Sequence, residues 1–371
     1  MNRNTISRRQ FARLLGAGAA LVAAKPALSL ARSPAPKTAA SELVRLGSNE
    51  NSYGPSPKAL QAITDSFQDA CRYPYGHVDT LLEALAKREG VAPEQILLGA
   101  GSSEILMLCA AAFTGSGDRT LVLADPTFEL IARPASFHGA EVVKVPLTST
   151  YAHDLPKMAA AAKRGLVYIC NPNNPTASLT PKSELREFIG TLPHEVAILV
   201  DEAYHDYVES DDYESVIPMI KDHPNLIVAR TFSKIYGMAG VRCGYCIAQP
   251  ETIKQLRPHQ SPHTVSIPAL AAAVASVKDR EHVPKYRALN RKTRATVTAD
   301  LDAMGYKSIP SEGNFVMVDL QQPVEPLIQA MRERKVVVGR LFPALPNHLR
   351  VTIAKESEMK AFLAAFREVM A

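Results

Sequence analysis

The 371-residue chain contains no tryptophan and only five cysteines. An odd number of cysteines at irregular spacing cannot form a complete disulfide framework, which excludes a small disulfide-stapled fold. Cys243 and Cys246 have CxxC spacing, but they lie in an apolar run and no second pair accompanies them. A four-ligand zinc site of this type needs the second pair, so we interpret both residues as core.

Outside its N-terminal residues, the chain also has no excess of either positive or negative charge. Five of the 42 basic residues fall within residues 1–31, which hold no acidic residue. The remainder has 37 basic and 37 acidic residues, so its net charge is near zero. We therefore expect no nucleic acid as a partner, because nucleic-acid binding requires a basic patch.

The first residues resemble an export signal. Residues 7–11 (SRRQF) form a twin-arginine pattern, and an apolar run over 14–24 is too short to span a membrane as a stable helix. We predict a twin-arginine signal peptide over 1–31 and a linker over 32–42, with no membrane attachment after the signal is removed. The mature protein would be periplasmic or secreted, or cytoplasmic if the leader is not used. An ordinary amphipathic helix is the alternative.

Short apolar strands alternate with helices in the middle of the chain, which is typical of a mostly parallel sheet covered on both faces. The expected strands are Gln95–Leu98, Thr120–Ala124, Glu141–Pro146, Leu166–Cys170, Val196–Val200, Leu226–Arg230 and Val241–Ile247. The expected helices are Ser56–Cys71, Thr80–Glu89, a helix ending at Phe113, Phe128–Phe137, Asp154–Ala162 and Lys182–Gly190, with a break over Arg72–Gly76.

The pattern changes after residue 266. Later helices are expected at Ile267–Val277, Glu281–Met304, Val324–Arg334 and Ser357–Met370, and later strands at Phe315–Leu320, Lys335–Val338 and His348–Ile353. We predict an α/β fold in which a large domain (71–265) carries a seven-stranded sheet between helices. A smaller α+β domain combines 43–70 with an interdomain helix and C-terminal domain over 266–371.

Lys234 follows the predicted strand 226–230 in a loop that also contains Thr231, Ser233 and Arg242. Desolvation at the end of a buried strand lowers the pKa of an amine and frees its lone pair for Schiff-base formation. The hydroxyls and the guanidinium can hold a phosphate beside it. A lone lysine in such a loop is more typically solvated, so a catalytic role for Lys234 depends on the other motifs of the chain.

Four further motifs fall at strand ends, where ligands bind in open α/β sheets. Two glycines and two serines over 99–103 precede a helix and can bind an anion, or simply cap the helix. The turn over 171–176 (NPNNPT) projects Asn174 over the strand ends, or is purely structural.

The other two motifs follow the strands 196–200 and 120–124. Asp201 and Tyr204 follow the strand 196–200. A buried aspartate is costly without a cationic partner, which a ligand could supply. A salt bridge within the protein or a helix cap is the alternative role for Asp201. Phe128, in the sequence DPTF, offers an aromatic ring at the same edge, although a core role is the ordinary interpretation.

One ligand accounts for all these residues together. It needs an aldehyde for Lys234, a protonated ring nitrogen for Asp201, a phenolate oxygen for Asn174 and Tyr204, and a flat ring for Phe128. It also needs a phosphate for a group of hydroxyls and one arginine: Ser102, Ser103, Thr231, Ser233 and Arg242. Pyridoxal 5′-phosphate has all these features.

From Leu43 onward the chain resembles the fold-type I, aspartate-aminotransferase-like pyridoxal-phosphate enzymes, and within them the histidinol-phosphate aminotransferase subgroup. The resemblance rests on motifs in a fixed order: SNENSYGPSP, RYP, GAGSSE, DPTF, NPNNPT, DEAY, TFSK, GVRCGY and LRVTIA.

The resemblance implies a role for each residue. Lys234 forms the Schiff base with the cofactor and moves the proton, Asp201 pairs with the ring N–H, and Phe128 stacks on the ring. Asn174 and Tyr204 bond the phenolic oxygen. The phosphate ligands are Gly101, Ser102, Ser103, Thr231, Ser233 and Arg242.

The resemblance also implies residues around the substrate. Tyr73 reaches the phosphate of a neighbouring subunit, which implies a homodimer. Arg350 pairs with the substrate carboxylate or an equivalent anion, and a segment from Asn49 to Tyr53 covers the substrate.

Two departures from the family stand out. Ala177 replaces a usual glycine after NPNNPT, which we expect to change only the turn. The stretch 338–343 (VGRLFP) is shorter and differently ordered than the pattern in which an arginine helps to bind a substrate phosphate. Arg340 is the candidate for that role, which the sequence leaves open.

We therefore expect an aminotransferase that moves an amino group between an amino donor and a 2-oxo acid acceptor. The donor would be an amino acid or a histidinol-phosphate-like amine. A decarboxylase of the phosphothreonine-decarboxylase type is an alternative on the same scaffold. A non-catalytic pyridoxal-phosphate-binding module is a remote one, because the chain shows no fused DNA-binding or transporter-contact element.

Overall fold

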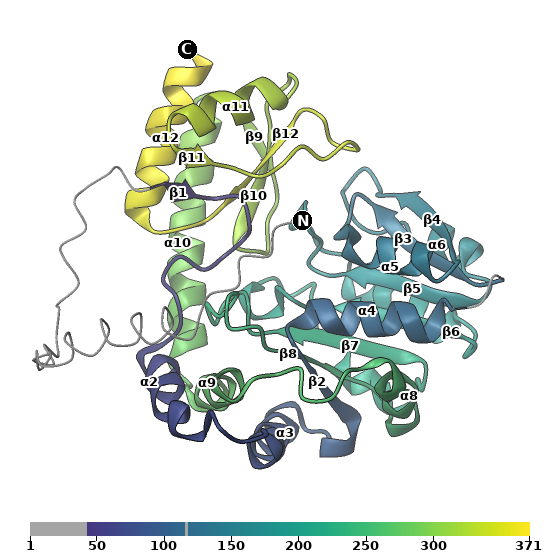
Figure 1. Ribbon diagram of the computed structural model, residues 1–371. Coiled ribbons are helices and arrows are strands. Elements are labelled where there is room, and N and C mark those ends of the chain that lie inside the picture. The colour runs from purple at the N-terminus through teal and green to yellow at the C-terminus, as the bar shows by residue number, and fades with distance from the viewer. Residues whose placement is uncertain (1–42, 116–117) are drawn as a thin grey trace, which may run out of the picture. The chain divides into compact units, whose positions relative to one another are not determined.

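A computed structural model describes residues 43–115 and 118–371 (Figure 1). The predicted signal peptide and linker lie outside the described residues. Seven strands form the large sheet, in the order β2-β8-β7-β6-β5-β3-β4. They are β2 (Ile96–Gly99), β3 (Thr120–Asp125), β4 (Glu141–Pro146), β5 (Gly165–Cys170), β6 (Val196–Asp201), β7 (Leu226–Thr231) and β8 (Gly244–Ile247).

The large sheet is parallel except for β8, which pairs antiparallel with β2 and β7. This confirms the predicted α/β fold with a mostly parallel seven-stranded sheet. Every residue of β5, β6 and β7 is buried, which explains why these strands are continuous apolar runs rather than alternating ones.

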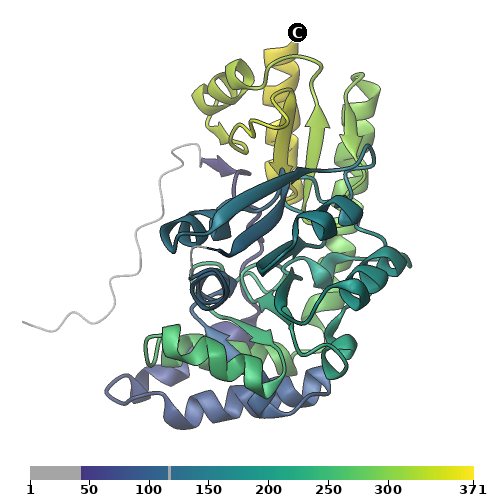
Figure 2. The same ribbon diagram turned by 90° about the vertical axis from the view of Figure 1, so that its right-hand side faces the viewer.

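Helices cover both faces of the large sheet (Figures 1 and 2). One hydrophobic cluster joins the sheet to α3 (Tyr75–Glu89), α6 (Leu155–Ala161), α7 (Lys182–Thr191) and α9 (Ile267–Lys278). The other cluster joins it to α4 (Ser102–Phe113), α5 (Ala132–Phe137) and α8 (Pro250–Leu256). Successive residues of a strand alternate between the clusters, since Leu121 and Leu123 belong to one and Val122 to the other.

A small antiparallel sheet has its own hydrophobic core. Its order is β12-β10-β9, formed by β9 (Lys307–Ile309), β10 (Phe315–Asp319) and β12 (His348–Thr352). Around it lie α10 (His282–Ala303), α11 (Glu325–Glu333), α12 (Glu356–Met370) and the parallel pair β1 (Val44–Arg45) and β11 (Val336–Val337). Helix α2 (Pro57–Ser66) instead packs on α9. The predicted boundaries at 70/71 and 265/266 stay predictions.

Short 3₁₀ helices complete the described elements: Phe67–Asp69, Pro93–Gln95, Glu129–Ile131, His205–Tyr207, Ile217–Lys221 and Arg257–His259. Within 43–115 and 118–371, no helix combines the length and apolarity that crossing a membrane requires. Cys243 and Cys246 are both fully buried, which confirms their interpretation as core residues.

Several predicted boundaries are wrong. The break expected over Arg72–Gly76 is too long, because α3 begins at Tyr75. The first N–H groups of a helix have no partner within the helix, so Pro74, which lacks an N–H, fits just before α3. The helix expected over Phe128–Phe137 is a 3₁₀ turn followed by α5, since Pro134 fits only within a first turn.

Strand β8 is also shorter than expected. It starts at Gly244 because Arg242 adopts φ +63°, which interrupts extended backbone. The sequence did not predict α8 or β9, which are only seven and three residues long.

Candidate active site

The candidate residues gather at the carboxyl edge of the large sheet. Strands β5, β6 and β7 end there at Cys170, Asp201 and Thr231, and β8 starts beside Thr231. A cavity of about 590 Å³, counting its open mouth, lies at this edge. Its lining comprises Ser102, Ser103, Phe128, Cys170, Asn174, Asp201, Ala203, Tyr204, Thr231, Ser233, Lys234, Ala239 and Arg242. Ten of the predicted site residues thus share one cavity.

One end of the cavity is suited to an anion. The Arg242 guanidinium donates to the carbonyls of Ala100 and Ala239, both at 3.0 Å, and to Ser233 Oγ at 3.4 Å. Thr231 Oγ1 donates to Ser233 Oγ at 2.9 Å. Helix α4 begins here at Ser102, so its free N–H groups and two serine hydroxyls add donors.

Gly101 is required by this packing. It adopts φ +80°, and a Cβ on it would occupy the space of the Arg242 guanidinium. Gly244 is equally constrained, because a Cβ there would collide with the backbone nitrogen of Ser102. The two glycines let the α4 N-terminus and Arg242 approach each other closely.

Asp201 is a buried carboxylate, only 2% exposed, at the end of β6. Its Oδ1 accepts the Ala203 N–H at 3.1 Å, and its Oδ2 accepts the hydroxyl of Tyr168 at 3.0 Å. Burial raises the pKa of Asp201 to about 6, against the Tyr168 hydrogen bond, which lowers it. A carboxyl held this way favours a cationic N–H partner in the cavity.

Sequence reasoning missed Tyr168. It is fully buried in β5, where its polar hydroxyl interrupts the aliphatic run GLVYIC. A buried tyrosine usually finds a partner for its hydroxyl, and that need was the available signal.

Lys234 lies opposite, with its amine near the N-terminal segment of the described chain. Its Nζ donates to the carbonyls of Ser48 and Asn49, both at 3.3 Å, and lies 5.5 Å from the centre of the Tyr204 ring. Burial, together with the Arg350 charge and against the opposing Asp201 carboxylate, lowers the pKa of Lys234 to about 8. A substantial fraction of this amine is neutral near pH 7 to 8, as a nucleophile requires.

Asn49 ties this segment to the cavity and to the small sheet. Its Nδ2 donates to the Tyr204 hydroxyl at 3.0 Å, and its backbone N–H donates to Thr352 Oγ1 at 2.9 Å. Asn314 Nδ2 donates to the Asn49 carbonyl at 3.1 Å. Asn314 and Thr352 were missed by sequence reasoning, because nothing local marks residues whose partners lie hundreds of positions away.

Arg350, from β12, borders the cavity through Asn174. Its Nη1 donates to Asn174 Oδ1 and its Nη2 to the Gly47 carbonyl, both at 2.6 Å. The guanidinium carbon lies 5.8 Å from the centre of the Phe315 ring and 5.1 Å from that of Phe342. Among the described residues, no group bonds the buried Nε. Burial lowers the pKa of Arg350, so this site favours an added anion.

Six predicted residues are not among those that line the cavity: Gly101, Asn49 and Arg350, described above, and Tyr53, Arg340 and Tyr73. Tyr53 packs its ring 5.2 Å from that of Tyr286. Arg340 forms an ion pair with Glu129 at 3.1 Å. Tyr73 is 72% exposed, with its ring 5.2 Å from that of His263.

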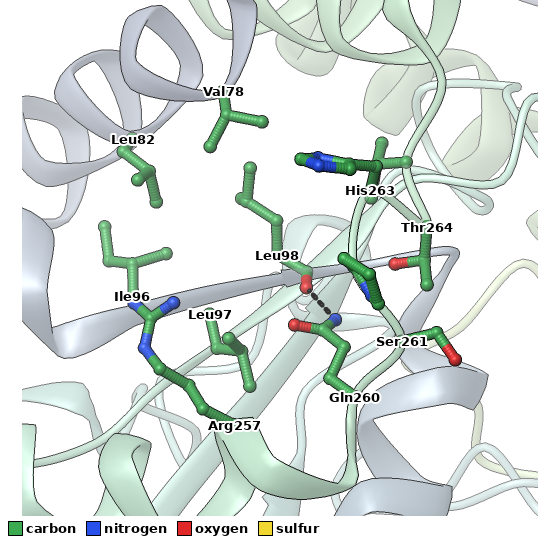
Figure 3. A pocket seen from close by; sticks show the side chains of 12 residues that line it. Val78, Leu82, Ile96, Leu97, Leu98, Arg257, Gln260, Ser261, His263 and Thr264 are labelled. Carbon is green, nitrogen blue, oxygen red and sulfur yellow. Dashed lines mark hydrogen bonds between the residues drawn. The ribbon is translucent and has the colours of Figure 1, made fainter. Parts of the chain in front are cut away.

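A separate cavity of about 860 Å³, counting its open mouth, lies between α3, β2 and residues 257–265 (Figure 3). Val78 and Leu82 form one wall and His263 the other, and Gln260 donates to the Leu98 carbonyl at 2.8 Å. None of the predicted site residues lines it, and it holds no amine, carboxylate and anion-binding loop together. We therefore assign the chemistry to the cavity at Lys234.

The residues present fit pyridoxal phosphate. An amine of lowered pKa, a buried carboxyl in need of an N–H partner and an anion-binding loop line the same space. Phe128 supplies an aromatic face at the same edge. Such convergent polar groups beside an aromatic side chain are typical of cofactor sites.

The comparisons with known proteins agree with this geometry. The model of the family described as "Aminotransferase class I and II" matches residues 41–366. The histidinol-phosphate aminotransferase of Moorella thermoacetica is 38% identical, over 89% of this chain and 86% of its own. Histidinol-phosphate aminotransferase 2 of Pseudomonas fluorescens strain Pf0-1 is 39% identical, over 89% of each chain.

A solved structure is also similar. The histidinol-phosphate aminotransferase of Sinorhizobium meliloti, in complex with pyridoxal-5′-phosphate, superposes with a TM-score of 0.82 at 29% identity, covering 89% of this chain and 91% of that one. With the family model matched along most of its length, this chain belongs to the class I and II aminotransferases and is a pyridoxal-phosphate-dependent aminotransferase resembling the histidinol-phosphate aminotransferases.

Proposed function

We propose that Lys234 is the lysine that carries the cofactor, and that the enzyme moves an amino group from an amino donor to a 2-oxo acid. One observation carries this proposal: the Lys234 amine, the buried Asp201 carboxyl and the anion-binding loop around Arg242 face a single cavity. When bound, pyridoxal phosphate supplies an aldehyde that condenses with amines and a ring that withdraws electrons from the donor Cα.

Lys234 has two tasks in this account. Its amine, with a pKa lowered to about 8, is nucleophilic enough at neutral pH to hold the cofactor aldehyde. As a free amine beside the bound donor, Nζ would take the proton from the donor Cα. Its carbonyl partners at Ser48 and Asn49 are weakly placed, at 3.3 Å, so the amine can leave them.

Asp201 would hold the ring nitrogen in its protonated state. A cationic N–H beside the carboxyl would favour the ionised form of Asp201 and lower its pKa again. Tyr168 and the Ala203 N–H fix the orientation of the carboxyl. The hydroxyls of Ser102, Ser103, Thr231 and Ser233 and the Arg242 guanidinium would hold the phosphate.

Arg350 would bind the carboxylate of an amino-acid donor, or the phosphate of a donor such as histidinol phosphate, which has no carboxylate. Its Nε lacks a hydrogen-bond partner among the described residues, and its Nη2 contact is to a backbone carbonyl at Gly47. A carboxylate is a better acceptor for a guanidinium than a neutral carbonyl, which supports an exchange of partners on substrate binding. Asn49 and the residues to Tyr53 would move with Gly47 and cover the substrate.

The donor is an amino acid or an amine resembling histidinol phosphate. The names of the relatives from Moorella thermoacetica and Pseudomonas fluorescens support an amine resembling histidinol phosphate. The different sequence over 338–343 supports testing amino acids as donors as well. Decarboxylation on the same scaffold is the competing reaction, because it uses the same lysine and the same ring.

A half-reaction screen tests this proposal. Holoenzyme is mixed with single donors, including histidinol phosphate and aromatic amino acids, and the absorbance of the lysine-bound cofactor is followed. A productive donor should remove that absorbance and yield one 2-oxo product per site, and a 2-oxo acid should restore it. Release of carbon dioxide without a 2-oxo product would instead establish the decarboxylase.

We also infer a homodimer in which Tyr73 reaches the phosphate of the neighbouring subunit. Tyr73 and Tyr75 are large, exposed aromatic side chains, 72% and 64% accessible, and they lie apart from the cavity of their own chain. Sedimentation of the holoenzyme should give twice the mass of the chain. Tyr73→Phe should weaken cofactor binding about tenfold, by loss of one hydrogen bond to a charged group.

Export of the folded holoenzyme by the twin-arginine route is a further part of the proposal. It rests on the SRRQF pattern at residues 7–11. Fusion of residues 1–42 to a reporter, with and without Arg8→Lys and Arg9→Lys, tests it. A reporter that stays in the cytoplasm in both cases would contradict export.

A further inference from the structure

Arg340, the arginine with an open role, is already paired. Its Nη2 lies 3.1 Å from Glu129 Oε2, and Glu129 Oε1 accepts a hydrogen bond from Lys144 Nζ at 2.8 Å. Lys144 Nζ also lies 3.7 Å from Asp125 Oδ1. The cluster holds two cations and two anions, so its formal charge is zero. Arg340 is therefore not an unpaired cation of the kind that binds a substrate phosphate.

The cluster is anchored close to the substrate side of the cavity. Glu129 directly follows Phe128, which lines the cavity. On the other side, the Gly339 N–H donates to the Arg350 carbonyl at 2.9 Å. A Cβ on Gly339 would lie only 2.7 Å from that oxygen and 2.9 Å from the Arg350 Cβ. This close approach fixes the backbone before Arg340 directly beside Arg350.

An aromatic ring joins the two arginines. The Phe342 ring centre lies 4.3 Å from the Arg340 guanidinium carbon and 5.1 Å from that of Arg350. Phe342 is 4% exposed and packs with the apolar residues Ile309 and Met317. A donor whose carboxylate meets Arg350 would thus extend toward aromatic and apolar surface and a neutralised charge pair.

We propose that Glu129 is a specificity-determining residue that compensates Arg340, so that the site favours amino donors with an uncharged aromatic or apolar side chain over donors that carry a phosphate. This inference rests on the proposed function and names its substrate class. A phosphate near Arg340 would meet the Glu129 carboxylate, and the like charges repel. Lys144 and Arg340 lower the pKa of Glu129, so that carboxylate is ionised at neutral pH.

The expected size of the effect is moderate. The side chains of Arg340 and Glu129 are 57% and 38% exposed, and solvent screens such a pair. Removing the carboxylate should therefore improve the use of a phosphate-bearing donor by about fivefold, not by several orders of magnitude.

The test compares L-phenylalanine with histidinol phosphate in half-reactions of the holoenzyme. The wild type should have the higher kcat/KM for phenylalanine. Glu129→Gln should raise kcat/KM for histidinol phosphate about fivefold and leave that for phenylalanine within about twofold. Arg340→Gln should also leave phenylalanine within about twofold. Glu141→Gln, an exposed residue on the strand that carries Lys144, is the matched control for loss of one negative charge.

Binding without turnover gives a second readout. In the Lys234→Ala background, the Kd of histidinol phosphate should fall about fivefold on adding Glu129→Gln, as measured by titration calorimetry. If the wild type prefers histidinol phosphate and Arg340→Gln removes that preference, the inference is overturned, while the proposed aminotransferase function still holds. If no donor of any kind converts the holoenzyme, the proposed function fails, and the inference fails with it.

Discussion

The two sides of the cavity differ in how the chain builds them. Asp201, Thr231 and Arg242 come from adjacent strands of the large sheet or the loop between two of them, and they bond within that sheet and the loops at its edge. Asn49 and Arg350, by contrast, hold the opposite side through bonds that join remote segments. The Asn49–Thr352 hydrogen bond alone spans 303 positions.

This difference separates two properties of the enzyme. The sheet side is rigid, since its strands are buried along their whole length, and it carries the groups suited to the cofactor. The opposite side depends on backbone carbonyls at residues 47–50, which can be exchanged for a substrate. We therefore expect changes on the sheet side to abolish the chemistry, and changes on the opposite side to alter which donor is used.

The largest effect is expected from Lys234→Ala. Without this amine no group remains to move the proton of the donor, so the half-reaction should slow by about 10⁴-fold. Rapid mixing of the loaded variant with a productive donor measures the rate. Lys254→Ala, an exposed lysine on α8, should behave as the wild type. A Lys234→Ala rate within tenfold of the wild type would remove the distinction between the two sides.

Asp201→Asn should separate activity from stability. An amide cannot support a protonated ring nitrogen, so turnover should fall by about 10² to 10³-fold. The apoprotein, however, should become more stable. Burial raises the pKa of Asp201 to about 6, so the stability that the protonated carboxyl contributes is present near pH 4 and is lost as the pH rises through about 6.

The asparagine variant has no such loss. Above pH 6 its free energy of unfolding should exceed that of the wild-type apoprotein by roughly 1–3 kcal/mol, and the two should converge near pH 4. Urea unfolding across this range gives the comparison. If the asparagine variant is the less stable protein at pH 7 to 8, burial of the ionised Asp201 carboxylate does not destabilise the apoprotein as we describe.

On the opposite side, Arg350→Lys should lower kcat/KM for any carboxylate-bearing donor by about 10- to 100-fold, because an ammonium cannot form the forked contact of a guanidinium. Cofactor affinity should not change. Arg332→Lys, on the exposed surface of α11, is the matched control. An equal loss of cofactor affinity would mean that Arg350 belongs with the sheet side instead.

The smallest effect is expected at Ala177, where the family usually has glycine. Ala177 adopts φ +58°, a strained conformation for alanine, but its methyl group is fully buried. In Ala177→Gly the relief of strain and the loss of buried surface nearly cancel, so stability should change by less than about 1 kcal/mol. Thermal unfolding of both proteins measures this difference, and activity should be unaffected.

The same comparison explains what the sequence could predict. The strand ends of the large sheet were predictable, because an apolar run followed by a polar motif marks each one, as at Asp201 and Thr231. A parallel sheet places these ends at one edge. The cofactor-facing residues could therefore be grouped from the sequence alone.

The opposite side could not be predicted in the same way. Asn49 bonds to Thr352 and Asn314 among its partners, and Arg340 pairs with Glu129, 211 positions away. No local pattern encodes such pairs. The late start of β8 was missed for a related reason, since the special conformation of a single residue, Arg242, sets it.

Chemical trapping of the cofactor tests the central assignment most directly. Holoenzyme is reduced with borohydride, which makes the bond between the cofactor and its lysine permanent, and the digested protein is analysed by mass spectrometry. We predict a single modified peptide, with the pyridoxyl phosphate mass on Lys234. Modification of a different lysine, or a fully loaded enzyme with Lys234 unmodified, would contradict the account.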